Sequence, residues 1–177
     1  PDPLTLRNYL IKRHILGTNA EADPVIYEEK DETLAVYLGK TKSKKYIVLY
    51  SGRTDASFSQ VIDADKPGKP VVVEPLKDNV DYSIDHAGGD AFYIRTNLDA
   101  KNYRLVQTPV STPGSANWKD VIPNRENVFL SGVDYFKNFM AVEEMSAGLT
   151  TIRIINRSDN SEHAINFGEP AYTAGIG

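Results

Sequence analysis

The histidines are the first residues to consider for catalysis or metal binding. The chain has three, His14, His86 and His163, and they lie far apart along the sequence. A zinc site carried on a helix needs two histidines within a few residues of each other, as in HExxH. The spacing therefore predicts no metal site, and no cofactor is expected either.

A second candidate is a nucleophilic triad, because Ser83, Asp85 and His86 occupy one short segment. In a β-strand, however, Ser83 and Asp85 point to one face and His86 to the other. No GxSxG turn is present to expose a strained nucleophile. We therefore predict no catalytic residue in this chain, and we interpret His86 as a turn-flanking residue that hydrogen-bonds a neighbouring loop.

Charged side chains gather at two predicted connections between strands. Glu28, Glu29 and Asp31 follow a short apolar run, and Arg125 and Glu126 lie in an equivalent connection further along. Paired carboxylates can share catalytic work or recognise a cation. Two interpretations remain open: these side chains are solvated, which we favour, or they form ion pairs across an interface.

The elements that carry these residues are predicted to be strands. Residues 80–84 alternate apolar and polar side chains, which is typical of a strand with one buried face. Gly88 and Gly89 allow a chain reversal, and Phe92–Ile94 is a second run of sheet-favouring residues. The segment 80–96 is therefore a predicted β-hairpin.

The same pattern recurs along the chain. A second strand repeats as KKYIVLYSG, GDAFYIRTN and KNFMAVEEM, and a third as SQVIDAD, YRLVQTP and IRIINR, at a period of about 44 to 49 residues. Repeats of this length, each a four-stranded unit, are typical of β-propeller blades. We predict an all-β fold, a partial propeller of three complete four-stranded antiparallel blades with partial blades at both ends.

The predicted boundaries follow from the repeat. The expected parts are the end of a blade at 1–32, complete blades at 33–78, 79–126 and 127–168, and the start of another at 169–177. Outer strands are expected at Tyr9–Leu16 and, more weakly, at His163–Phe167, and residues 171–176 resemble a further strand. No stretch shows convincing helical periodicity, so very little helix is expected.

Composition excludes several classes of protein. The 177 residues are 41% hydrophobic, which is ample for one globular core, and the net charge of −4 disfavours a nucleic-acid binder. The absence of cysteine excludes disulfides and thiolate metal sites and fits a cytoplasmic protein. No apolar run approaches the ~20 residues that cross a bilayer, so no membrane partner is expected.

Six short segments, in order over nearly the whole chain, carry a family resemblance. They are Tyr27–Asp31 (YEEKD), Tyr82–His86 (YSIDH), Phe92–Asn97 (FYIRTN), Ile122–Asn127 (IPNREN), Gly148–Thr150 (GLT) and Ile155–Arg157 (INR). Together they resemble the oligopeptidase B (protease II) branch of the prolyl oligopeptidase family of serine peptidases.

This resemblance implies a larger parent protein. Members of the family join a seven-bladed propeller to an α/β-hydrolase domain that carries a Ser, Asp and His triad, and the oligopeptidase B branch cleaves short peptides after Arg or Lys. The propeller covers the active site and restricts substrate size. This chain resembles the middle of that propeller, so none of the family's catalytic residues can be assigned to it.

The implied partners are therefore the hydrolase domain of the same polypeptide and, for the parent, short basic peptides. Glu28, Glu29, Asp31, Arg125 and Glu126 are the candidates for contacts between the two domains. The alternative is a stand-alone β-rich module that binds a protein or peptide. An open reading frame that continues past Gly177 into a GxSxG motif would favour the first hypothesis, and a stop codon there the second.

An unclosed propeller would also expose strand edges and blade faces, which favours self-association. We expect residues 9–16 or 171–176 to add to the sheet of a neighbouring copy.

Overall fold

A computed structural model describes residues 1–176, in two compact units, Pro1–Asp81 and Tyr82–Gly177. The regular structure is almost entirely β, as the sequence predicts. Two short 3₁₀ turns, η1 (Ala20–Ala22) and η2 (Ser115–Asn117), are the exceptions among the described residues. Within that same part of the chain, no helix is long and apolar enough to cross a membrane.

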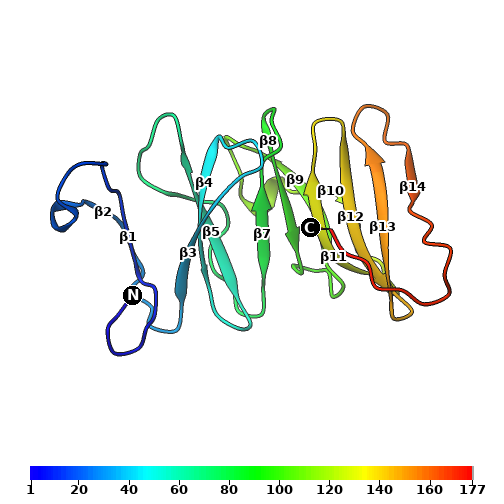
Figure 1. Cartoon of the computed structure of the whole chain (residues 1–177), viewed down its shortest axis with the longest axis horizontal. Helices are drawn as coiled ribbons and strands as arrows, with labels where there is room; N and C mark the ends of the chain where they lie inside the picture. The colour runs from blue at the N-terminus through cyan, green and yellow to red at the C-terminus, as the bar shows by residue number, and fades with distance from the viewer. Residues whose placement is uncertain (177) are drawn as a thin grey trace. The chain divides into compact units, whose positions relative to one another are not determined.

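The first unit holds a two-stranded and a four-stranded antiparallel sheet. The strands are β1 (Leu10–Lys12), β2 (Val25–Glu28), β3 (Ala35–Lys40), β4 (Tyr46–Gly52), β5 (Ser57–Asp63) and β6 (Val71–Val72). β1 pairs with β2, and the larger sheet has the order β3-β4-β5-β6, so each strand lies beside its neighbour in sequence (Figure 1). This is the meander that the repeat predicts.

The central strands of that sheet are buried as their composition predicts. Leu49 on β4 is fully buried, and Ile62 on β5 is buried on the same face of the sheet. Strand β1 is shorter than the expected strand at 9–16. Beyond Lys12 the regular strand ends, and the Thr18 amide donates to the Ile15 carbonyl at 3.1 Å, so the end of the expected strand forms a turn instead.

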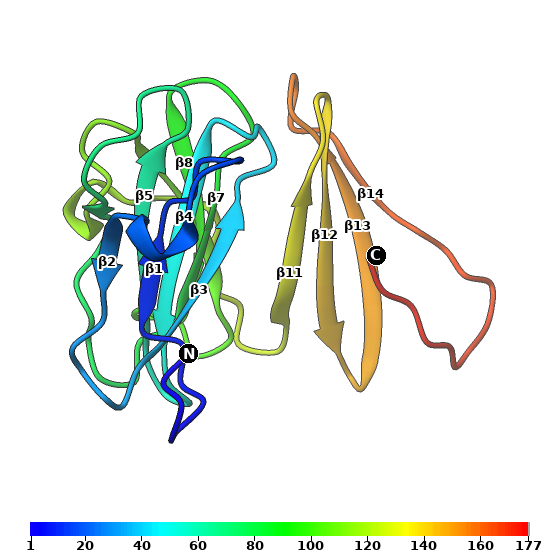
Figure 2. The same cartoon turned by 60° about the vertical axis from the view of Figure 1, so that its left-hand side comes forward.

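The second unit contains two four-stranded antiparallel meanders. Their strands are β7 (Tyr82–Asp85), β8 (Ala91–Thr96), β9 (Arg104–Pro109) and β10 (Lys119–Ile122), then β11 (Phe129–Tyr135), β12 (Phe139–Ser146), β13 (Leu149–Asn156) and β14 (Glu162–Ala164). Each sheet again follows chain order, and Figure 2 shows β11 to β14 side by side. The hairpin predicted at 80–96 is the β7–β8 pair.

Two hairpins depend on backbone with positive φ. Gly88 and Gly89 have φ of 92° and 79°, which a residue without Cβ adopts at little cost. The β12–β13 loop has only two residues, Ala147 and Gly148, with φ of 50° and 80°. Both are positive, as in the tight turn that matches strand twist, but Ala147 carries the steric cost of a side chain.

The core of the second unit lies between its two sheets. Its buried members are Leu105, Ile122, Leu130, Tyr135, Met140, Val142 and Ile155. The rings of Tyr93 and Tyr135 pack against each other across the two sheets, with centroids 5.0 Å apart. Because this cluster joins β9 and β10 to β11, β12 and β13, it fixes one sheet against the other.

The last part of the chain differs from two sequence expectations. The outer strand β14 covers Glu162–Ala164 and ends before the expected Phe167, and residues 171–176 form no strand. Within the described residues, the main chain of 171–176 makes one hydrogen bond, and its acceptor is a side chain. The Ile176 amide donates to Glu143 Oε2 at 3.0 Å. A strand needs a ladder of backbone partners, and these residues have no such ladder.

Candidate functional site

Glu29, one of the predicted interface acids, is an internal hydrogen-bonding group in the first unit. It is buried, and its carboxylate accepts from the Tyr27 hydroxyl at 2.6 Å and from the Asp31 amide at 3.1 Å. Burial, reinforced by the hydrogen bond to Glu29, raises the pKa of Tyr27. The Glu29 side chain therefore shapes the connection after β2.

Arg7 closes the same connection from the other side. Its Nη1 donates to the main-chain carbonyls of Leu34 at 2.9 Å and Asp31 at 3.1 Å. Asp31 itself is exposed, and hydrogen bonds from the Thr33 side chain and amide lower the pKa of its carboxyl. Glu28 is exposed at the end of β2. Of these acids, Glu28 and Asp31 present carboxylates at the surface of the unit.

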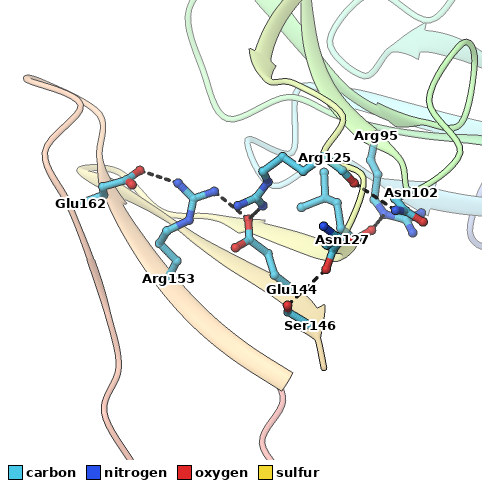
Figure 3. Close-up of polar contacts among 9 residues, drawn as sticks. Arg95, Asn102, Arg125, Asn127, Glu144, Ser146, Arg153 and Glu162 are labelled. Atoms are coloured by element: carbon cyan, nitrogen blue, oxygen red, sulfur yellow. Dashed lines mark hydrogen bonds and ion pairs between the residues drawn. The ribbon is translucent and has the colours of Figure 1, made fainter. Parts of the chain in front are cut away.

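The connection from β10 to β11 holds the other two candidates, Arg125 and Glu126, and it is firmly attached to its own unit. Asn102 lies in the turn after β8, and its Nδ2 donates to the carbonyls of Arg125 at 3.0 Å and Glu126 at 2.6 Å (Figure 3). The Asn102 amide also donates to Asn124 Oδ1 at 3.1 Å. The connection is therefore held in one conformation by side chains of the preceding sheet.

Arg95 supports the start of β11 in the same way. Its Nε donates to the Leu130 carbonyl at 2.7 Å, and its guanidinium lies 3.7 Å from the centroid of the Tyr103 ring. On the other side of the connection, Ser146 Oγ donates to the Asn127 carbonyl at 3.1 Å. Polar contacts from both sheets thus converge on one short segment.

The charged end of this arrangement is a chain of four side chains, one from the connection, Arg125, and one each from β12, β13 and β14. Glu144 is buried, and its Oε1 accepts from both Arg125 Nη2 and Arg153 Nη2, the latter at 2.6 Å (Figure 3). Arg153 also contacts Glu162 through Nη1. Burial alone would lower the pKa of Arg153, but its hydrogen bonds to Glu144 and Glu162 outweigh burial and raise it.

The structure thus separates the predicted residues into two groups. Glu29 and Arg125 are engaged within their own units, whereas Glu28, Asp31 and Glu126 present exposed side chains. Sequence reasoning missed Glu144, Arg153 and Asn102. The signal was the opposite charge of Glu144 and Arg153 on adjacent strands, but using it required the register that pairs Glu144 with Thr151 and Val142 with Arg153.

The three histidines have different surroundings. His86 is buried with its ring edge-on to Phe92 at 5.7 Å, and its Nε2 is 3.0 Å from the Gly89 carbonyl in its own hairpin turn. His14 pairs with Asp23 at 3.0 Å, and His163 is exposed on β14. Among residues 1–176, no group of three His, Asp or Glu side chains is placed to hold a metal ion.

Comparison with known proteins identifies a family with this architecture. Residues 4–176 match the family described as prolyl oligopeptidase, N-terminal beta-propeller domain. The chain is 34% identical over 176 residues to dipeptidyl aminopeptidase BI of Pseudoxanthomonas mexicana, with 99% of this chain and 24% of that protein covered. It is 31% identical over 165 residues to protease 2 of Moraxella lacunata, covering 93% of this chain and 23% of that protein.

Solved structures of the same family have a similar fold. Oligopeptidase B from Leishmania major superposes on 94% of this chain and 24% of its own, with a TM-score of 0.86 at 22% identity, a likeness of fold. Oligopeptidase B from Trypanosoma brucei, solved in a closed form with covalently bound antipain, covers 93% of this chain and 24% of its own, with a TM-score of 0.84 at 26% identity. The chain spans about a quarter of the length of these relatives.

The propeller prediction is thus confirmed, because the chain, with its three meanders of four strands, matches the propeller domain of this family. The chain belongs to the prolyl oligopeptidase family, as a segment of its N-terminal β-propeller domain.

Proposed function

We propose that this chain is the non-catalytic propeller segment of an oligopeptidase B-like serine endopeptidase that cleaves short peptides after Arg or Lys. In the parent, the propeller covers the active site of the hydrolase domain and restricts the size of the substrate. The observation that carries this proposal is the match of residues 4–176 to the propeller domain of the prolyl oligopeptidase family. The 31% identity to protease 2 supports the oligopeptidase B branch.

A second specificity deserves a direct comparison, because the chain is 34% identical to a dipeptidyl aminopeptidase. That name denotes release of dipeptides from a free amino terminus, whereas an endopeptidase accepts a blocked one. The two activities share a family but differ in how the peptide's amino end is held.

The test uses the complete reading frame that contains this chain and two reporter peptides with the same Ala-Arg sequence. One reporter has a blocked amino terminus and the other a free one. An endopeptidase turns over the blocked reporter, and exclusive turnover of the free dipeptide reporter would replace our proposal with the dipeptidyl aminopeptidase. A reading frame that stops at Gly177 would favour the stand-alone binding module.

Size restriction has its own test. The parent should cleave a short peptide that contains one Arg and should leave the same sequence intact when it is part of a folded protein. Equal cleavage of both substrates would refute the size filter. The unfolded form of the same protein serves as the matched control, because it has the same chain length without the folded structure. It therefore shows whether length or folding prevents cleavage.

We further propose that the exposed acids at the blade connections, Glu28, Asp31 and Glu126, contact the hydrolase domain. Ion pairs of this kind contribute little energy each but influence how readily two surfaces meet. In the parent, Glu28→Gln and Glu126→Gln should lower kcat/KM by about threefold each, an effect that high salt reduces. Glu32→Gln, an exposed acid in the same loop as Glu28, is the control; equal losses in all three variants would refute the assignment.

A further inference from the structure

A polar cavity of about 970 Å³ opens in the second unit between the sheet of β7 to β10 and the ends of β11 to β14. Turns of both sheets line it: Gly88 and Gly89 after β7, Lys137 and Asn138 after β11, and Arg157 after β13. Figure 1 shows the turns after β11 and β13 at the same end of their sheet. This volume is typical of sites that bind small molecules or short peptides.

Arg157 is held in the lining of this cavity by several contacts. Its Nη1 donates to the main-chain carbonyls of Phe136 at 3.0 Å, Ala87 at 3.3 Å and Lys137 at 3.4 Å. Its guanidinium also lies 5.9 Å from the centroid of the Tyr93 ring. Within the described residues, the hydrogen bonds of Arg157 all use Nη1, so the remaining guanidinium N–H groups are available to a ligand in the cavity.

The charge balance of the cavity is positive. Arg157 and Lys137 contribute cations, and Asp120 is the one carboxylate of the lining. Asp120 already accepts from Arg104 Nη1 at 3.2 Å, so its charge is compensated from its own sheet. Asn138 and Asn156 add amide groups, which can donate to an oxygen ligand.

We propose that this cavity binds a small anionic ligand through an oxyanion, a carboxylate or a phosphate, held by Arg157 and Lys137. A guanidinium already fixed by three carbonyl acceptors loses little conformational freedom on binding, and its planar fork fits two oxygens at once. Lys137 supplies a second, mobile charge. This inference rests on the cavity alone and does not depend on the proposed function.

Amide NMR titration of the isotope-labelled chain tests the proposal with three probes: N-acetyl-trialanine, its C-terminal amide, and inorganic phosphate. The carboxylate peptide or phosphate should shift the resonances of Gly88, Gly89 and Asn138 in a saturable way, with a Kd of about 1 mM. The response of each probe identifies which source of oxyanion the site accepts. The neutral amide should leave these resonances unchanged.

Substitutions locate the binding groups. Lys137→Gln should weaken binding about threefold, and Arg157→Lys, which keeps the charge but loses the fork, about tenfold. Asp120→Asn should strengthen binding about twofold, because it removes the opposing charge. Lys137 and Asp120 are exposed, and their substitution does not remove the hydrogen bonds from Arg157 to main-chain carbonyls. These two variants therefore keep the test valid if Arg157→Lys impairs folding.

The matched control is Lys101→Gln, an exposed lysine in the turn after β8, at the opposite end of that sheet. It should leave binding unchanged. The proposal is overturned if neither anion gives a saturable shift, if the neutral amide binds as well as the carboxylate, or if Lys101→Gln weakens binding as much as Lys137→Gln.

Discussion

The chain of charges across β12, β13 and β14 makes a sharp prediction at Glu144. This carboxylate is only 5% exposed and accepts from two guanidinium groups, those of Arg125 and Arg153. Glu144→Gln keeps the shape of the side chain and one acceptor oxygen but removes the charge. Both arginines would then face a neutral amide in a partly buried position.

The expected cost is worked from the exposure of the partners. Removing one partner of a fully buried ion pair typically costs about 3–5 kcal/mol. Here the Arg125 side chain is 38% exposed, so water can solvate it, and Arg153 keeps its contact with Glu162. We therefore expect Glu144→Gln to lower the free energy of unfolding by about 2 kcal/mol.

The assay is equilibrium urea unfolding, followed by the fluorescence of Trp118 and by circular dichroism. Trp118 is the only tryptophan of the chain, and it packs edge-on against Tyr82 at 6.0 Å, so its emission reports on the second unit. Glu126→Gln is the matched control, because Glu126 is exposed and its structural contact uses the main-chain carbonyl. It should change stability by less than about 0.5 kcal/mol.

A double-mutant cycle with Arg125→Gln isolates the pair itself. The coupling free energy between Arg125 and Glu144 should be about 1 kcal/mol, since Arg153 remains a partner of the same oxygen. Equal stabilities of the Glu144→Gln and Glu126→Gln variants, or a coupling near zero, would refute the argument that Glu144 holds the connection before β11.

Three further predictions concern the stability of the chain. Burial raises the pKa of Tyr135 well above its ordinary value of 10.0, and burial together with the Glu29 hydrogen bond raises the pKa of Tyr27. The neutral phenols therefore stabilise the fold fully below pH 10. This contribution is lost as the pH rises through the folded-state pKa values. Alkaline unfolding followed by phenolate absorbance checks this, and Tyr135→Phe should flatten the dependence; an unchanged profile would contradict it. Ala147→Gly should raise the free energy of unfolding by about 1 kcal/mol, because glycine accepts the positive φ of the β12–β13 turn without strain, and a thermal midpoint equal to or below that of the unmodified chain would show that the turn is not strained. Arg95→Lys should cost about 1–2 kcal/mol in urea unfolding, because lysine cannot donate to the Leu130 carbonyl and stack on Tyr103 with the same planar group; a cost below about 0.3 kcal/mol would assign Arg95 to the solvated surface.

Much of this fold could be predicted from sequence because the information is local and repeated. Alternating side chains and the glycines at 88 and 89 determine the β7–β8 hairpin, and the recurrence of that pattern predicts the meanders. The ends of the outer strands are harder to predict from sequence. β14 lies at the edge of its sheet, and the segment 171–176 joins no ladder. In both places pairing depends on neighbouring strands, and composition says little.

The site could be predicted only in part, for a physical reason. Glu29 and Arg125 are recognisable as charged residues in connections, but whether such a side chain faces solvent or a buried partner depends on register. Glu144 meets Arg153 only because Val142 pairs with Arg153 across β12 and β13. The Arg157 cavity likewise assembles turns that follow β7, β11 and β13, which are far apart in sequence.

We propose that this chain provides a segment of the propeller and that the catalytic groups lie in the rest of the parent protein. The most direct measurement is the hydrolysis of one amino-blocked Arg reporter by the purified chain and, in parallel, by the protein from the complete reading frame, each with and without a serine-directed inhibitor. Turnover by the complete protein alone, abolished by the inhibitor, is the predicted result. Turnover by residues 1–177 that survives removal of contaminants, or none by the complete protein, would contradict the account.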